Sequence, residues 1–324
     1  MAETDILIEA DQVTRHFPGG DALSSVSFQV RRGEIMALLG PNGSGKTTAL
    51  RILAGFLAPT SGRVRVDGYD LVFQSLEARR RIGYLPESAP LHLDMRVEEY
   101  LTFRGRLHGL RGARLTARLR NTLDRCGLGE VSRRTLASLS RGFRQRTALA
   151  DCLLHEPDVL LLDEPMTGLD PTQVQATQDI LRETAHQGAV VFSTHVLTEA
   201  EQVSHQALIL NAGRVAAHDS PARLARTAAR LRVELFAPAE RLAHALEALP
   251  GAHDIRLHAL SDGWTDVSIR TGQDDLSDAL RDLAQQEQWP LRGLRRDAKG
   301  FADTYLRLTT LPPRIQNPLP RKSS

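Results

Sequence analysis

The chain has 324 residues, of which 41% are hydrophobic and 25% charged, and its formal net charge is +2. This length accommodates one large and one smaller domain; the near-neutral charge argues against a surface devoted to nucleic acid, and two cysteines are too few for a disulfide framework. No apolar run approaches the about 18 residues of a membrane span, and the start MAETDILIEA lacks an export signal, so we expect a cytoplasmic protein with reduced thiols.

Two amphipathic strands are predicted at the start of the chain. Residues 5–17 and 22–30 alternate apolar and polar side chains, as antiparallel strands with one solvent-exposed face do. Phe17 is the aromatic residue of this region. Its ring can pack in the core or stack on a purine, and its position in the sequence favours neither role.

A glycine-rich loop, GPNGSGKTT at residues 40–48, follows the apolar run 34–39 and precedes a helix that we expect to reach about Ala54. Glycines at a strand-to-helix turn let backbone N–H groups surround an anion at the positive end of the helix dipole. We therefore expect Lys46 to reach the terminal phosphates of a nucleoside triphosphate and Thr47 to hold magnesium.

A helical insertion is predicted in the middle of the chain. A short strand at 63–66 and a polar helix at 75–81 lead to residues 88–150, where three helical patterns occur almost without strand signal. From Arg96 to Arg146 the sequence has thirteen arginines and four acidic residues. This surplus fits a solvated helical face, or else a surface near anionic lipid headgroups or an acidic partner loop.

Two buried strands are predicted to end in polar side chains. The apolar runs at 159–165 (VLLLDEP) and 189–195 (AVVFSTH) flank a helical segment, which indicates a parallel crossover unit. Ligands bind beyond the carboxyl ends of such strands, so Asp163 and Glu164 should lie at the edge that carries the phosphate loop. Asp163 can hold magnesium and Glu164 can activate the attacking water, whereas His195 can contact the ligand or be an ordinary strand-end histidine.

The stretch LSRGFRQR at 139–146 opens the third helix of the insertion, with Ser140 at an N-cap position and Gly142 in the first turn. Such a helix end binds anions. Because the phosphate loop already surrounds the phosphates of its own chain on one side, this helix end is useful only if it comes from another subunit. The sequence therefore indicates dimerisation around ATP.

A second, smaller domain is predicted after the nucleotide-binding part. The pattern strand, helix, strand, strand, helix, strand is that of the ferredoxin-like split motif. We expect a nucleotide-binding domain at 1–220 with its helical subdomain at about 88–150, an accessory α+β domain at 229–310 and a disordered tail at 311–324. The accessory domain can serve homodimerisation or sense a small molecule, and no group of its residues points to a ligand.

Five motifs occur in order, namely GPNGSGKTT, LSRGFRQR, LLLDEP, GLD and STH. Together they resemble the Walker A, signature, Walker B, D-loop and switch-histidine motifs of ABC-transporter ATPase subunits, over about residues 5–220. The resemblance implies an α/β fold, an ABC-type P-loop core of mixed sheet with a helical insertion, and two such domains closing head to tail on two ATP molecules. RIGYLPESAPLHLDMRVEEYL and the ending FADTYLRLT are similar to the gliding-motility and drug-efflux branch of type-2 ABC exporters.

The resemblance also implies roles for individual residues. The catalytic residues would be Glu164, His195 and Glu87, with Glu164 as the general base and His195 in contact with the γ-phosphate. Asp170 would lie at the dimer seam. Ser140 and Gly142 would address the ATP of the opposite subunit. The residues expected around the nucleotide are Phe17 at the adenine, Gly40, Pro41, Asn42, Gly43, Ser44, Gly45, Lys46, Thr47, Thr48, Ser140, Gly142 and Asp170, with Thr47, Asp163 and Glu87 at magnesium.

Two positions depart from the family pattern. The family usually has glutamine where this chain has Glu87; a carboxylate can still accept at magnesium, but it adds charge and removes a donor. In the signature motif, which usually reads LSGGQ, Arg141 and Phe143 replace a glycine and the glutamine.

These motifs imply the ATP-binding subunit of an exporter, which hydrolyses MgATP to drive separate integral-membrane permease subunits at the inner face of the cell membrane. A coupling helix of the permease would dock between Glu87 and the helical insertion. The alternative is a soluble ABC-type ATPase acting on nucleic acid or ribosomes. Long coiled coils or tandem ATPase domains normally mark that class, and this chain has neither, so we expect no nucleic-acid partner.

Overall fold

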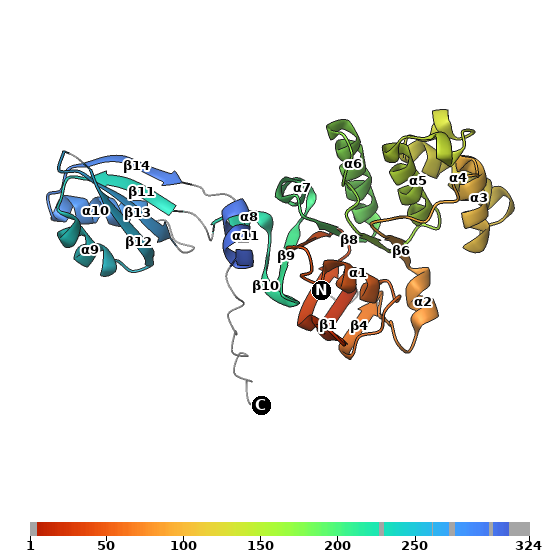
Figure 1. The fold of residues 1–324 in the computed structure, drawn as a ribbon, viewed down its shortest axis with the longest axis horizontal. Helices are drawn as coiled ribbons and strands as arrows, with labels where there is room; N and C mark the ends of the chain where they lie inside the picture. The colour runs from red at the N-terminus through yellow and green to blue at the C-terminus, as the bar shows by residue number, and fades with distance from the viewer. Residues whose placement is uncertain (1–4, 227–229, 261, 272–275, 298–300, 311–324) are drawn as a thin grey trace. The chain divides into compact units, whose positions relative to one another are not determined.

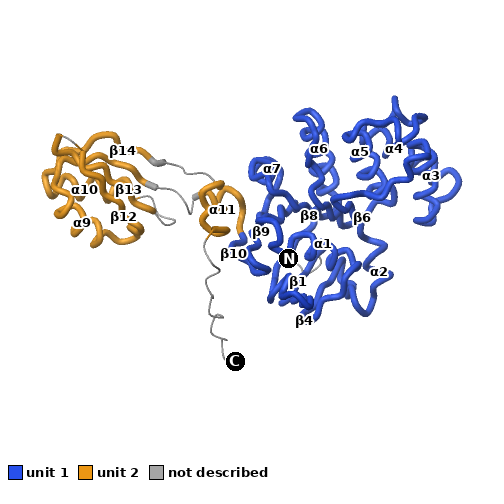
Figure 2. Tube along the Cα trace, viewed as in Figure 1, with its two compact units in different colours: residues 1–218, 311–324 blue, residues 219–310 orange. Residues whose placement is uncertain are grey.

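The computed structural model describes residues 5–226, 230–260, 262–271, 276–297 and 301–310. The chain forms two compact units, one over residues 1–218 and the other over residues 219–310 (Figure 2). The expected tail at 311–324 lies outside the described residues. Among the described residues, no helix combines the length and the apolar character needed to cross a membrane.

A six-stranded sheet in the order β10-β9-β3-β8-β7-β6 forms the centre of unit 1 (Figure 1). The pairs from β9 to β6 are parallel. Every residue of β3, β7 and β8 is buried. For β7 and β8 this confirms the prediction that these continuous apolar runs are strands covered on both faces. The strands are β3 (Ile35–Leu39), β6 (Ile82–Leu85), β7 (Val159–Leu162), β8 (Ala189–Thr194), β9 (Gln206–Asn211) and β10 (Arg214–Asp219).

A second, antiparallel sheet in the order β2-β1-β4-β5 packs against the first through α1 (Lys46–Leu53). One hydrophobic cluster runs through all three layers, from Leu7 of the second sheet through Leu50 of α1 to Leu161 of the first. This packing fixes the start of α1, and hence the phosphate loop, relative to the strand ends. The strands are β1 (Ile6–Phe17), β2 (Gly20–Arg31), β4 (Ser61–Val66) and β5 (Tyr69–Asp70).

The helical insertion contains the three expected helices, α3 (Val97–Leu107), α4 (Gly112–Arg125) and α5 (Arg141–Leu153), after the short α2 (Ser75–Arg80). A polar network joins α3 to α5: Tyr100 Oη donates to Asp151 Oδ2 at 3.2 Å, and Arg104 Nε donates to Asp151 Oδ1 at 2.8 Å. Both cysteines are free and buried, and burial raises the pKa of Cys126 to about 12. Thiols in such surroundings are unreactive.

Several elements of unit 1 were not anticipated from the sequence. The strands β9 and β10 follow α7 (Leu197–Val203), and β9 pairs in parallel with β3. The sheet therefore continues past β3 on the side opposite β8. By contrast, the helix α6 (Pro171–Gln187), which joins β7 to β8, was expected from the sequence.

Unit 2 has the sheet order β12-β13-β11-β14 with antiparallel neighbours, which confirms the ferredoxin-like arrangement. Its elements are β11 (Arg230–Leu235), α9 (Ala239–Glu247), β12 (Ala252–Ala259), β13 (Thr265–Thr271), α10 (Ser277–Gln286) and β14 (Leu291–Asp297). Leu242 of α9 and Leu280 of α10 are fully buried against the sheet residues Val233 and Val267. The unit also contains α8 (Pro221–Arg226) and α11 (Phe301–Thr310), where Thr304 Oγ1 donates to Leu224 O at 2.6 Å.

Candidate active site

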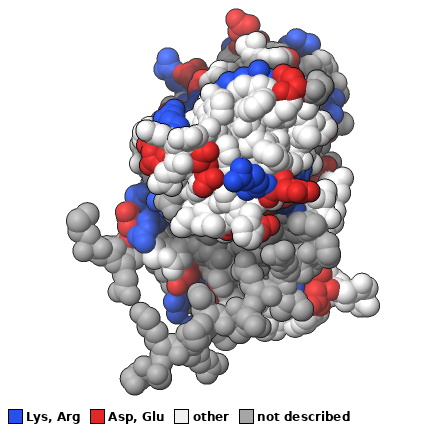
Figure 3. All heavy atoms as spheres, turned by 90° about the vertical axis from the view of Figure 1, so that its left-hand side faces the viewer, with Lys and Arg blue, Asp and Glu red and all other residues white. Residues whose placement is uncertain are grey.

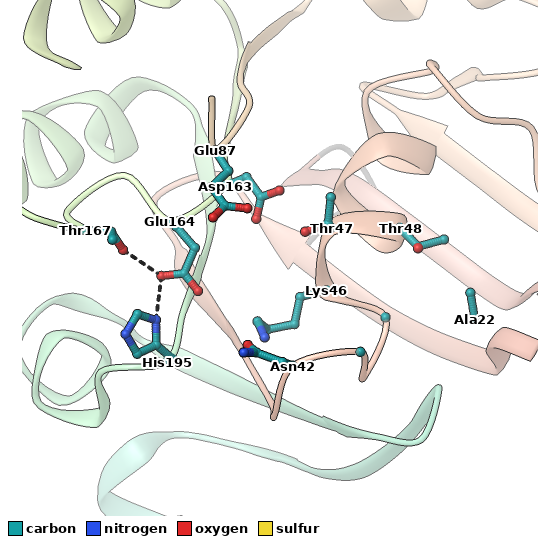
Figure 4. Close-up of a pocket in the computed structure, with 12 residues that line it drawn as sticks. Ala22, Asn42, Lys46, Thr47, Thr48, Glu87, Asp163, Glu164, Thr167 and His195 are labelled. Atoms are coloured by element: carbon teal, nitrogen blue, oxygen red, sulfur yellow. Dashed lines mark hydrogen bonds and ion pairs between the residues drawn. The ribbon is translucent and has the colours of Figure 1, made fainter. Parts of the chain in front are cut away.

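A pocket of about 700 Å³ lies at the carboxyl ends of the parallel strands. The loop after β3 contributes the glycine-rich segment, and the ends of β6, β7 and β8 contribute acidic and imidazole side chains (Figure 4). The sequence prediction that these segments meet at one sheet edge is thus reproduced in the structure. The lining consists of Ala22, Asn42, Gly43, Gly45, Lys46, Thr47, Thr48, Glu87, Asp163, Glu164, Thr167 and His195.

The phosphate loop requires glycine at two positions. Gly40 has φ +154°, and a Cβ there would lie 2.3 Å from the carbonyl oxygen of Leu210; Gly45 has φ +106°, and a Cβ would lie 2.4 Å from the carbonyl oxygen of Ala22. Gly45 is the N-cap of α1 and offers no side-chain cap. Because the first N–H groups of a helix have no intrahelical acceptor, this end of α1 is available to an anion.

Lys46 is buried at the floor of the loop, with 8% of its surface exposed. Its Nζ donates to the carbonyl oxygens of Gly40 at 2.8 Å and Pro41 at 3.2 Å. Burial lowers the pKa of Lys46, and the carboxylates of Glu164, Asp163 and Glu87 act in the opposite direction. A phosphate oxygen is a stronger acceptor than these carbonyls, because its hydrogen bond to an ammonium is charge-assisted.

Asp163 has 1% of its surface exposed and directly follows β7. Its Oδ1 accepts a hydrogen bond from Ser193 Oγ at 2.6 Å, and the same hydroxyl accepts from the Glu164 N–H at 2.9 Å. Asp163 Oδ2 is also buried, and it has no hydrogen-bond partner among the residues that the structure describes. A buried acceptor left open in this way fits a magnesium ion or one of its water ligands, and Thr47 and Glu87 offer further oxygens in the same pocket.

Glu164 adopts a left-handed backbone conformation, with φ +51°, which is uncommon for a residue other than glycine. Its carboxylate Oε2 accepts from Thr167 Oγ1 at 2.9 Å and lies 2.9 Å from His195 Nδ1 (Figure 4). Two contacts to one oxygen fix the orientation of the carboxylate. The His195 side chain is 56% exposed, so its ring can meet a ligand on the solvent side of Glu164.

Phe17, expected at the adenine, lies at the end of β1 and does not line the pocket. It is 42% exposed, and the Arg15 guanidinium lies over its ring, 4.8 Å from the ring centre. The stacking role therefore remains a prediction.

The signature helix begins outside the pocket. Ser140 is the N-cap of α5 and accepts a hydrogen bond from the Phe143 N–H at 3.5 Å. Gly142 is packed so closely on Gln173 of α6 that a Cβ would lie 2.0 Å from Gln173 Oε1. Asp170 caps α6, because its Oδ1 accepts from the Gln173 N–H at 2.9 Å. The predicted opposite-subunit residues thus form one patch across the starts of α5 and α6.

Two residues with clear positions at the site were missed as site residues. Ser193 joins Asp163 to Glu164, although the sequence marks it only as a polar residue at a strand end. Thr167 lies three residues after Glu164 in the turn that follows β7. That spacing brings the Thr167 hydroxyl back to the Glu164 carboxylate within one turn, and it is the local sequence feature that could have identified Thr167 as a site residue.

Comparison with known proteins agrees with this geometry. The family model described as ABC transporter matches residues 23–167. The chain is 33% identical to the daunorubicin resistance ATP-binding protein DrrA3 of Streptomyces coeruleorubidus over 96% of this chain and 94% of that protein. It is 41% identical to the uncharacterized ABC transporter ATP-binding protein YxlF of Bacillus subtilis, over 64% of this chain and 69% of that protein.

The fold is likewise similar to a solved ATP-binding cassette, a dimer in a post-hydrolysis state with bound ADP and phosphate. The TM-score is 0.59 at 25% identity, over 66% of this chain and 98% of the other. The match to DrrA3 over nearly the whole chain and the shared cassette fold identify the family. The chain belongs to the ABC transporter ATP-binding proteins and is an ATP-binding, ATP-hydrolysing subunit of a transporter.

Proposed function

We propose that this chain hydrolyses MgATP in a head-to-tail homodimer and thereby drives export by separate integral-membrane permease subunits, to which it binds at the inner face of the cell membrane. One observation carries the dimer: the pocket holds the phosphate loop and both carboxylates, whereas Ser140 at the start of α5 lies outside it. A second copy would supply that helix end. The resistance named for DrrA3 and the dimeric state of the solved cassette support export and dimerisation respectively.

The residues of the pocket divide the chemistry among them. Lys46 and the first N–H groups of α1 bind the β- and γ-phosphates, and Glu164 accepts the proton of the attacking water. His195, which contacts the Glu164 carboxylate through Nδ1, would meet the γ-phosphate. Thr47, Asp163 and Glu87 would hold magnesium, which neutralises charge on the phosphates when it is bound.

Mixing two inactive chains tests the head-to-tail arrangement. Lys46→Ala disables the phosphate loop, and Ser140→Arg blocks the start of α5. If Ser140 acts on the opposite subunit, a dimer of the two variants has one site with an intact loop and an intact Ser140, so ATP hydrolysis should return on mixing. If Ser140 acts within its own chain, both sites in the mixture are damaged and no hydrolysis returns.

Glu164→Gln tests the general base. We expect turnover to fall on the order of 100-fold or more while ATP still binds, so that an ATP-bound dimer accumulates in light scattering. Glu240→Gln, an exposed position in α9 of unit 2, is the matched control and should hydrolyse ATP normally. Unchanged hydrolysis by the Glu164 variant would remove the assignment.

The partner class is tested by purification from membranes. Co-purification with an integral-membrane protein is expected. Co-purification with nucleic acid or ribosomes instead would favour a soluble ABC-type ATPase and contradict the transport role.

We assign residues 1–220 to nucleotide binding and 229–310 to an accessory domain that serves homodimerisation or ligand sensing. Deleting residues 229–324 should then change dimerisation or the rate of ATP hydrolysis. Unchanged dimerisation and rate would dispose of both roles.

A further inference from the structure

The turn between α3 and α4 concentrates unpaired positive charge. We call residues 106–114 (RLHGLRGAR) the α3–α4 turn. Arg106, Arg111 and Arg114 are exposed, and none of them has a carboxylate within 4.0 Å among the residues that the structure describes. The sequence between Glu99 and Asp124 contains no acidic residue, so the nearest acids along the chain lie outside the turn.

Three other arginines of the insertion have acidic partners. Arg104 bonds Asp151, Arg118 pairs with Glu156, and Arg125 Nε lies 3.1 Å from Glu183 Oε2. These three therefore have structural partners, which the α3–α4 turn lacks.

Unit 2 shows the same pairing of charges. Arg232 meets Asp266 at 2.8 Å, and Figure 3 shows basic and acidic side chains interspersed on the face that it draws. The three arginines of the α3–α4 turn have no such pairing among the residues that the structure describes.

The α3–α4 turn is held in place by its own packing. Leu110 is buried with Leu115 and Leu154, and the His108 ring stacks on His155 with 4.1 Å between ring centres. The arginines thus project from a fixed turn. Figure 1 shows α3 and α4 at the edge of unit 1, on the side of α5 away from α6.

Apolar side chains are exposed beside these cations. Leu107 is 63% exposed and Phe103, one turn earlier in α3, is 40% exposed. Cations flanking exposed leucine and phenylalanine are the pattern of surfaces that lie in a membrane interface, where the apolar groups enter the headgroup layer and the cations meet lipid phosphates. An acidic protein loop would use the arginines and leave the leucine exposed to water.

We propose that the α3–α4 turn binds the anionic headgroup surface of the membrane in which the permease lies. The proposal rests on the proposed function for its location, but its chemistry can be measured without a permease. Each arginine near an anionic surface should contribute about fivefold to binding, so three should contribute on the order of 100-fold.

Vesicle flotation of the full chain tests the proposal, with vesicles of equal parts phosphatidylglycerol and phosphatidylcholine and with pure phosphatidylcholine. The test variant is Arg106→Gln/Arg111→Gln/Arg114→Gln. The matched control is Arg31→Gln/Arg80→Gln/Arg214→Gln, three exposed arginines outside the insertion, which removes the same net charge. Both variants keep the cations of residues 311–324.

We expect the test variant to lose binding to the anionic vesicles on the order of 100-fold and the control to change only severalfold. High salt should weaken binding of the unmodified chain to the anionic vesicles. At the original salt concentration, Leu107→Ser should also bind these vesicles more weakly than the unmodified chain. Equal losses in the two triple variants, no binding by the unmodified chain, or equal binding to pure phosphatidylcholine would each overturn the proposal. Loss of permease capture in detergent with vesicle binding intact would assign the turn to an acidic protein loop instead, which also overturns it.

Basal ATP hydrolysis, measured without vesicles, separates this proposal from the proposed function. Both triple variants should hydrolyse ATP like the unmodified chain, because none of the six arginines lines the pocket. If the unmodified chain binds the vesicles but no permease co-purifies with it, the transport role fails while the lipid site stands.

Discussion

Replacing Ser193 by alanine removes one hydroxyl that holds both acidic residues of the pocket. Ser193 is fully buried at the end of β8; its Oγ donates to Asp163 Oδ1 at 2.6 Å and accepts from the Glu164 N–H at 2.9 Å. Alanine fits the space, so the change leaves the carboxylate and the N–H buried without this partner. The effect should therefore come from lost hydrogen bonds and not from a packing defect.

The expected loss of stability follows from the two bonds. A hydrogen bond to a charged carboxylate contributes about 1.5–3 kcal/mol and one between neutral groups about 1 kcal/mol. The free energy of unfolding should therefore fall by roughly 2–4 kcal/mol. Glu164 also loses the anchor of its strained backbone, so the maximal rate of ATP hydrolysis should fall on the order of 10- to 100-fold, because small displacements of a catalytic group are costly.

Urea unfolding measures the first quantity and steady-state hydrolysis the second. The Michaelis constant for ATP should change much less than the maximal rate, because the phosphate loop keeps its contacts. Ser204→Ala is the matched control: its hydroxyl donates to Ala200 O at 2.6 Å, away from the pocket, so about 1 kcal/mol of stability and no activity should be lost. A Ser193 variant with the stability and maximal rate of the unmodified chain would refute the reasoning.

Three further changes test other contacts. Gly45→Ala, at φ +106° and with its Cβ 2.4 Å from a backbone oxygen, should lower ATP affinity at least tenfold in a nucleotide-binding titration while the fold persists. Burial lowers the pKa of His155 to about 4. In the unfolded chain this histidine has its ordinary pKa of about 6.5, so on acidification the unfolded chain takes up the proton first. The contribution of His155 to stability is therefore complete above about pH 6.5, and the free energy of unfolding falls by up to about 3 kcal/mol as the pH drops to 4. His155→Gln should flatten this dependence in urea unfolding at a series of pH values, and an unchanged slope would contradict it. Asp151→Asn should cost about 1–2 kcal/mol by weakening its contact with Arg104. Asp179→Asn, whose side chain is 62% exposed in its ion pair with Arg182, should cost less than about 0.5 kcal/mol in the same assay.

The parts of the site that could be predicted from the sequence are those with local signals. The phosphate loop at 40–48 can be recognised because its motif consists of consecutive residues. The strands β7 and β8 can be recognised because a short, continuous apolar run fits a strand buried on both faces better than other structures. Because carboxyl ends of parallel strands share an edge, Asp163 and His195 could be placed beside the loop before their contacts were known. Local sequence motifs, combined with the rule on parallel strand ends, were therefore sufficient to locate the pocket.

Other features depend on contacts between residues far apart in the chain. Ser193 lies 30 residues from Asp163, and only the pairing of β7 with β8 brings its hydroxyl to the carboxylate. The strand β9 lies beside β3 although the second sheet, the helical insertion, β7, β8 and α7 all come between them in the chain. An isolated apolar run does not say where in a sheet it will pair. Phe17 shows the same limit, since its exposure depends on how the end of β1 is covered.

The segment between β7 and α6 links the proposed base to the proposed dimer seam. Thr167 holds the Glu164 carboxylate, and Asp170, three residues later, caps α6. The first turn of α6 in turn carries Gln173, which is packed against Gly142 at the start of α5. If a partner subunit contacts Asp170 as proposed, it would act on a turn of only a few residues, one end of which orients Glu164 while the other supports the start of α5. Formation of the proposed dimer would then align the base through the hydrogen bond from Thr167 to Glu164.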